Sequence, residues 1–157
     1  MKDHYKFIAD SMLLGLVRWL RFLGFQTWCF QNLIDVRELL QKDPNFIYLT
    51  CSKSHIQQLK PTHFYLITED LIERQLHSLN ERFEIFQSAR LLTLCTVCNA
   101  AVEKIDKKEI KTKVPQKVHE NFKQFWQCPD CQRVYWNGGH IVRLKEKLTR
   151  MKIPLPE

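Results

Sequence analysis

The sequence lacks four features that would each point to a particular class of protein. No apolar run reaches the ~18 residues of a membrane-spanning helix, since the apolar stretch Met12 to Leu23 is interrupted by Arg18 and Arg21. The first residues lack the apolar segment of a secretory signal. There is also no internal repeat and no low-complexity tract. We therefore expect a cytoplasmic protein with no membrane partner, built as one domain with at most a small appended module.

Acidic residues are in the minority. The chain has 157 residues, and 24 Lys and Arg against 17 Asp and Glu give it a formal charge of +7. A positive excess attracts polyanions over long range, although many basic domains bind none. The charge alone favours nucleic acid only weakly.

Strands and helices alternate through the first two-thirds of the chain. The pattern predicts an α/β fold with a mostly parallel sheet flanked by helices, whose strands end at one shared edge. Asp10 and Thr50 end two of these strands, and Thr68 follows a third and should cap the next helix. The predicted strands are 6–10, 27–30, 46–50 and 63–67, and the predicted helices are 12–23, 35–41, 52–59, 68–83 and 141–151.

Six cysteines without a signal segment indicate metal ligands and free thiols, not disulfides. Cys95 and Cys98 form one C-x-x-C pair, and Cys128 and Cys131 form a second. Two such pairs can complete a tetrahedral zinc site with no open position, which makes the zinc structural. The alternatives are two redox motifs or incidental buried thiols. We expect a four-cysteine zinc ribbon with a basic tail over 91–157, after a first domain over 1–90.

The other two cysteines have plain interpretations. Cys29 lies in an apolar strand and should be a small core residue. Cys51 lies at the predicted sheet edge with His55 close in sequence, but this proximity does not build a catalytic pair.

Several charged residues could serve a metal-dependent phosphodiesterase. Carboxylates gathered at one edge can hold divalent cations, and guanidinium groups suit phosphate. The alternative is that Asp10 caps a helix and that the others are solvated helix faces. The candidates are Asp10, Asp35 and Glu38 for the metal, and Arg18 and Arg21 for the substrate.

Two segments carry a family resemblance. The first is Phe7-Ile8-Ala9-Asp10 with Met12 to Phe25, and the last is the cysteine pairs with Tyr135-Trp136-Asn137-Gly138-Gly139-His140. Weaker matches are Ile34 to Leu40 and Ile47 to Thr50. Together they resemble the Mut-seven-type C-terminal ribonuclease domain family, which are PIN-like domains with an appended zinc ribbon.

The resemblance implies a PIN-like fold, RNA as the substrate, and Mg²⁺ or Mn²⁺ held by acids that Asp10 and Asp35 match. The chain departs from the family at one point. Where the family has Leu-Thr-Arg-Asp, this chain has Leu49-Thr50-Cys51-Ser52. Serine is a poor replacement for a carboxylate on Mg²⁺. Glu38, Glu69 or Asp70 are the acids that could compensate.

The sequence leaves three functions open. The first is a metal-dependent endoribonuclease, with Thr50 or Ser52 orienting water and no organic cofactor. The second is an inactive RNA-binding or protein-docking module, using the basic stretches Lys104 to Lys117 and Arg143 to Lys152 with Trp126 or Trp136. The third is a toxin-like partner in a regulatory pair. His140 is expected to fix the ribbon against the sheet.

Overall fold

The computed structural model describes residues 4–154. The elements, in chain order, are β1 (Phe7–Asp10), the 3-10 turn η1 (Ser11–Leu13), α1 (Leu14–Phe22), β2 (Thr27–Phe30), α2 (Leu33–Lys42), β3 (Ile47–Thr50), α3 (Lys53–Leu59), β4 (His63–Leu66), α4 (Ile72–Phe83), β5 (Glu103–Ile105), the 3-10 turn η2 (Lys107–Ile110), α5 (Gln116–Asn121), β6 (Phe125–Gln127), β7 (Val134–Tyr135) and α6 (Gly139–Arg150). None of the helices in this part of the chain is long and apolar enough to cross a membrane.

Four parallel strands form the main sheet, in the order β2-β1-β3-β4. Phe7 pairs with Thr27 on one side of β1, and Ile8 pairs with Tyr48 on the other. The fold class predicted from the sequence is confirmed: helices flank a parallel sheet, and four cysteines cluster in the C-terminal region.

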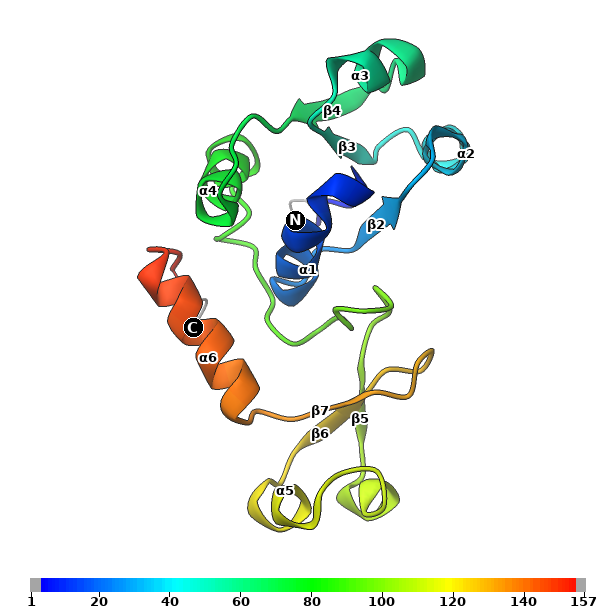
Figure 1. The fold of residues 1–157 in the computed structure, drawn as a ribbon. Helices are drawn as coiled ribbons and strands as arrows, with labels where there is room; N and C mark the ends of the chain where they lie inside the picture. Colours follow the sequence, from blue (N-terminus) through cyan, green and yellow to red (C-terminus); the bar gives the residue numbers. More distant parts are fainter. Residues whose placement is uncertain (1–3, 155–157) are drawn as a thin grey trace.

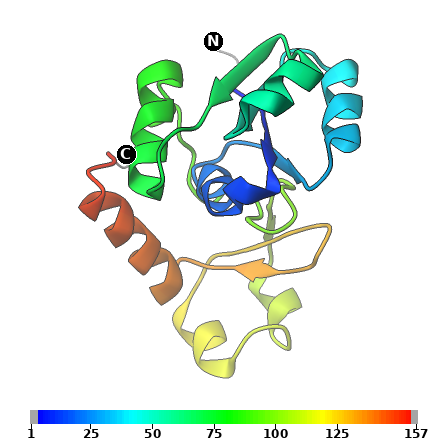
Figure 2. The ribbon, with the colours of Figure 1, turned by 45° about the horizontal axis from the view of Figure 1, so that its top comes forward.

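Side chains alternate between the two faces of the sheet, and each face is buried under its own helices. Phe7, Ala9 and Leu49 belong to the large core cluster that includes residues of α1, α4 and α6. Ile8 and Tyr48 belong to a smaller cluster with Val36 of α2. Figures 1 and 2 show α1 and α4 on one side of the sheet and α2 and α3 on the other. Asp10, two residues after Ile8, lies on the α2–α3 side.

Single residues define one end of each of two early helices. Gly24 adopts φ 91° just past Leu23, the C-cap of α1, and a Cβ there would lie 3.0 Å from Thr93 Oγ1, so the stop requires glycine. Asn32 caps α2, because its side chain accepts a hydrogen bond from the Asp35 amide.

The start of α4 was predicted wrongly. Thr68 does not cap it, because the helix begins at Ile72 after the N-cap residue Leu71. The chain between Thr68 and Leu71 is instead held by side chains: Gln75 donates to the carbonyl of Glu69 at 2.8 Å, and Glu69 accepts from the Thr68 amide at 3.3 Å. Residues 68–71, predicted as the first turn of the helix, therefore form a loop at the edge of the sheet.

A small antiparallel sheet, β5-β6-β7, forms the second part of the chain. In the described part of the chain its hydrophobic cluster has three buried members, with partly buried side chains packed around them: Ile110, Val114 and Phe125. A cluster of this size stabilises a fold weakly, so the segment needs another source of stability.

The last helix returns to the main sheet domain. Ile141 and Leu148 of α6 and the following Ile153 belong to the large core cluster. His77 of α4 lies 2.7 Å from the carbonyl of Met151, and both ribbon views show α6 beside α4. The chain therefore leaves the core for the small sheet and comes back. The domain boundary after residue 90 stays a prediction.

Candidate functional site

Asp10 is the centre of a polar cluster at the carboxyl end of β1. Its carboxylate is 7% exposed and does not cap the turn that follows it. Oδ1 accepts a hydrogen bond from the Tyr48 hydroxyl at 2.5 Å. Oδ2 accepts a short hydrogen bond from Thr50 and lies 3.0 Å from Nδ1 of His55. We call these four residues the Asp10 cluster.

Strand register explains why these groups meet. Ile8 faces Tyr48 across the β1–β3 pair, so Asp10 and Thr50, each two residues further along, point to the same face. The helix α3 covers that face and carries His55. Burial and the hydrogen bond to Asp10 raise the pKa of Tyr48 well above its usual range, so the hydroxyl stays a donor at neutral pH.

Thr50 and Ser52 hold the start of α3. The Thr50 hydroxyl accepts from the Ser52 amide at 3.0 Å, and the Ser52 hydroxyl accepts from the His55 amide at 3.2 Å. Ser52 is therefore the N-cap of α3. It fixes the backbone of His55, the residue whose ring contacts Asp10.

The other two predicted acids lie on α2. Asp35 stands in its first turn, where its Oδ2 accepts from the side chain of Asn32 at 2.8 Å. Glu38 is exposed about one turn later. The helix α2 follows β2, and β2 is parallel to its neighbour β1. The first turn of α2, which contains Asp35, therefore lies toward the same edge of the sheet as Asp10. No group of three or more metal-ligating side chains that includes these acids is found within residues 4–154.

The two predicted phosphate-binding arginines have different surroundings. Arg18 is exposed on α1. Arg21 is 9% exposed, and its guanidinium donates to three carbonyls: Thr27 at 2.9 Å, Thr96 at 3.0 Å and Val97 at 3.0 Å. Burial lowers the pKa of Arg21 from its usual value. Its Nε and Nη1 donors are used within the protein, so Arg18 is the arginine that α1 presents to solvent.

A cleft of about 590 Å³ opens beside the Asp10 cluster, at the ends of β3 and β4. Glu69 and Asp70 both line it, as do Cys51 and Lys53. The buried Oε1 of Gln75, also in its lining, has no hydrogen-bond partner in the described part of the chain. The cleft therefore brings the two loop acids to the same edge as Asp10.

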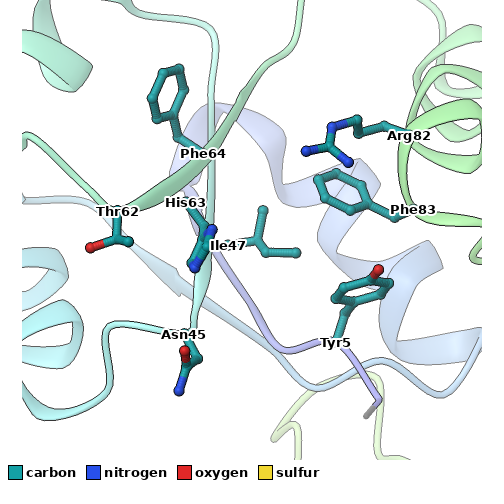
Figure 3. A pocket seen from close by; sticks show the side chains of 8 residues that line it. All are labelled: Tyr5, Asn45, Ile47, Thr62, His63, Phe64, Arg82 and Phe83. Carbon is teal, nitrogen blue, oxygen red and sulfur yellow. The ribbon is translucent and has the colours of Figure 1, made fainter. Parts of the chain in front are cut away.

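A second pocket, of about 300 Å³, lies at the opposite ends of the strands. Figure 3 shows Ile47 and His63, the first residues of β3 and β4, with Tyr5 and Phe83 on one side. Arg82 stacks on Phe83 with 5.2 Å between its guanidinium carbon and the ring centroid. Ligands of open α/β sheets bind at the carboxyl edge, which leaves this pocket apart from the candidate site.

The four paired cysteines come together as predicted. Their sulfur atoms all lie within 4.8 Å of one another, and the sulfurs of Cys95 and Cys131 are 3.8 Å apart. Thiolates placed tetrahedrally at the ~2.3 Å of a Zn–S bond are about 3.8 Å apart. The group could therefore hold a metal ion such as zinc.

Both cysteine pairs adopt the same turn. Asn99 donates its amide to the carbonyl of Cys95 at 2.9 Å, and Gln132 donates to that of Cys128 at 3.0 Å. Asn99 and Gln132 have φ of 65° and 63°. Such paired turns present two sulfurs each toward one point.

Neighbouring groups prepare Cys95 to act as a thiolate. Burial alone would raise its pKa, but hydrogen bonds from the Tyr135 hydroxyl at 3.0 Å and from backbone amides lower it to about 7. Hydrogen bonding with Cys131 raises the pKa of Cys98 to about 12. Four sulfurs this close resist carrying four charges without a cation among them.

Comparison with known proteins agrees with these observations. Residues 5–148 match the Mut7-C RNAse domain, from before β1 to within α6. The chain belongs to the Mut7-C RNAse domain family. The match includes both the Asp10 cluster and the four cysteines, so the family unit spans the two sheets. No curated protein and no solved structure matches the chain.

Sequence reasoning missed two members of the Asp10 cluster and the role of Arg21. The predicted strand 46–50 includes Tyr48, and sequence proximity relates His55 only to Cys51, so the sequence places neither residue beside Asp10. In fact Cys51 is exposed and Cys29 packs against the large core cluster. The alternation along β3 could have placed Tyr48 with Thr50.

His140 is exposed at the start of α6.

We predict that Arg21→Ala lowers the free energy of unfolding by about 3 kcal/mol, because three carbonyls lose a charged donor. Arg18→Ala, on the exposed side of the same helix, should change it by less than about 0.5 kcal/mol. Urea unfolding of both variants, followed by circular dichroism, measures the difference. Equal effects of the two substitutions would contradict the structural role of Arg21.

Proposed function

We propose that this Mut7-C RNAse domain protein cleaves phosphodiester bonds of RNA at the edge formed by the Asp10 cluster. The observation that carries the proposal is the buried carboxylate of Asp10 at the carboxyl end of a central parallel strand. This is where parallel α/β sheets bind ligands. Family membership supports a ribonuclease-like activity, and RNA is the partner it implies.

A divalent cation, Mg²⁺ or Mn²⁺, is the cofactor we propose for this reaction, and Asp10 with Asp35 would hold it. Asp10 ends β1 and Asp35 follows the neighbouring strand β2, and both supply carboxylate oxygens as metal ligands. Hard cations of this kind keep several water ligands when few protein ligands are present. The donor set fits one loosely held ion and not a pair. When bound, such an ion supplies an activated water and stabilises charge on phosphate.

The chain's own residues have separate tasks in this proposal. Tyr48, Thr50 and His55 fix the orientation of the Asp10 carboxylate through the contacts described above. Arg18, exposed on the helix that follows Asp10, would hold a substrate phosphate. Glu69 and Asp70 lie in the adjoining cleft, where either could add a further acid.

Ser52 offers a direct test, because its position tolerates a carboxylate. Aspartate is as good an N-cap as serine, so Ser52→Asp should preserve α3 while placing an acid at the edge. The family pattern has an acid at this position. We expect the substitution to strengthen metal binding.

We predict that the protein cleaves single-stranded RNA slowly with Mn²⁺. Asp10→Asn should lower the cleavage rate by more than about a hundredfold, because losing only a group that supports a metal ligand already costs about tenfold to a hundredfold. Ser52→Asp should raise the rate. Glu73→Gln, an exposed acid on α4, is the control and should leave it unchanged. Cleavage by Asp10→Asn at the wild-type rate would exclude the proposed site.

The contacts of Asp10 also favour a second function, which is binding without cleavage. Its two oxygens already accept from Tyr48 and Thr50 and contact His55, and Ser52 supplies no acid. A chain with this site could bind RNA, or dock a protein, without cutting. If wild type, Asp10→Asn and Ser52→Asp all bind RNA equally and none cuts, the non-catalytic function is the correct one.

We further propose that the four cysteines hold a structural zinc ion. The support is the close approach of the four sulfurs, with the Cys95–Cys131 pair at 3.8 Å, and the small hydrophobic cluster of the β5-β6-β7 sheet. All four positions are thiolates, so no position remains for a reacting water. Zinc would supply the stability that this segment lacks.

We predict one zinc ion per chain by elemental analysis of protein purified under reducing conditions. Cys98→Ser should lose it, whereas Cys51→Ser should keep it, because Cys51 is exposed and outside the group. Acid should release zinc, since protons compete for thiolates such as Cys95, whose metal-free pKa is about 7. Folded, reduced protein without zinc would contradict the proposal.

A further inference from the structure

A cleft of about 490 Å³ lies between the small sheet and the start of α6. We call it the ribbon cleft. It shares no residue with the Asp10 cluster or with the cleft beside it. Its volume falls in the range of roughly 300–1,000 Å³ that small-ligand sites occupy. Six of its lining residues matter here: Phe122, Arg133, Tyr135, Trp136, His140 and Arg143.

Three aromatic rings line the ribbon cleft, and the fold holds them in place. Trp136 packs on the buried Phe125 with 6.4 Å between ring centroids. Gly138 lies against the indole, since a Cβ there would be 2.7 Å from Trp136 Cδ1. The hydroxyl of Tyr135 is bound to the sulfur of Cys95, which leaves its ring as the part that can meet a ligand.

All the charged side chains of the ribbon cleft are basic. Arg133, Arg143 and His140 line it, and no Asp or Glu does. The side chains of these three make no hydrogen bond or ion pair with another residue in the range 4–154. Within that range their side-chain donors are available to a ligand. An occupant should therefore carry negative charge as well as flat apolar faces.

The charge distribution along the whole chain also favours a negatively charged occupant of the ribbon cleft. Residues 91–157 contain 13 Lys and Arg against 7 Asp and Glu, whereas residues 1–90 contain 11 against 10. Nearly all of the excess positive charge thus belongs to the part of the chain that forms the ribbon cleft. Long-range attraction would bring a polyanion to this part first.

We propose that the ribbon cleft binds a nucleotide of single-stranded RNA, with a base against its aromatic rings and phosphates at Arg133 and Arg143. Bases stack on aromatic side chains whatever their sequence, and guanidinium groups bind phosphate in a fork. The inference rests on the proposed function only in taking RNA as the ligand. The cleft would hold the strand at a distance from the cleaved bond.

The test measures binding without cleavage. A short fluorescein-labelled single-stranded RNA of mixed sequence is titrated with the intact zinc-loaded chain, without Mg²⁺ or Mn²⁺, and its anisotropy is recorded. Arg133→Ala with Arg143→Ala should weaken binding by at least about tenfold. The control pair, Lys147→Ala with Arg150→Ala, removes the same charge from α6 outside the cleft and should weaken it by less than about threefold.

Phe122→Ala tests stacking independently of charge, and we expect it to weaken binding by about tenfold. Zinc content and circular dichroism verify that each variant is folded. Equal losses in the two charge pairs, or unchanged binding in Phe122→Ala, would overturn the proposal.

A competing partner is tested in the same assay. If an unlabelled acidic peptide displaces the RNA at equal concentration, and its own binding needs Arg133 and Arg143, the cleft is a protein-docking site and the proposal is wrong. Failure of the Mn²⁺ cleavage test would overturn the proposed function alone, because the binding measured here requires no cleavage.

Discussion

The hydrogen bonds of the buried Arg21 guanidinium join the two parts of this protein. A cation buried to this degree needs its donors satisfied, because an unpaired buried charge is strongly destabilising. One acceptor, the carbonyl of Thr27, belongs to the start of β2, and the other two belong to the turn between Cys95 and Cys98. The site of Arg21 is complete only when that turn is folded. The four-cysteine group and the main sheet are thus coupled through one side chain.

A second contact at the same junction extends this coupling to the sheet. The side chain of Asn99, 7% exposed, accepts from the Thr27 amide at 2.7 Å. Thr27 pairs with Phe7, and three residues further along the same two strands Asp10 pairs with Phe30. The turn that contains Cys95 and Cys98 therefore supports the strand pair that positions Asp10. The zinc site that we propose would thus stabilise the main sheet as well as the β5-β6-β7 sheet, without taking part in RNA cleavage.

Much of the fold was predictable because it follows from local signals. Strand 27–30 was predicted with the bounds that the structure has. The cysteine spacing predicted the four-sulfur group because two short turns suffice to build it. The predicted start of α4 was wrong, because the Gln75–Glu69 contact holds a loop where Thr68 was expected to cap the helix.

The site was less predictable, because its contacts join residues far apart in the chain. Tyr48 and His55 reach Asp10 across 38 and 45 positions, and Arg21 reaches Thr96 across 75. Periodicity shows which face of an element a residue lies on, and not which distant partner it meets. The ribbon cleft is a similar case, since Arg143 of α6 lines the same cleft as Phe122, which lies before β6 in the chain.

Amide hydrogen exchange of Thr27, followed by NMR with and without a zinc chelator, tests the coupling most directly. We predict that zinc removal lowers the protection of the Thr27 amide along with that of Asn99, while the Ile47 amide, bonded to Lys6 within the sheet region, stays protected. Unchanged protection of Thr27, with loss confined to the cysteine turns, would show that the sheet does not depend on the zinc site.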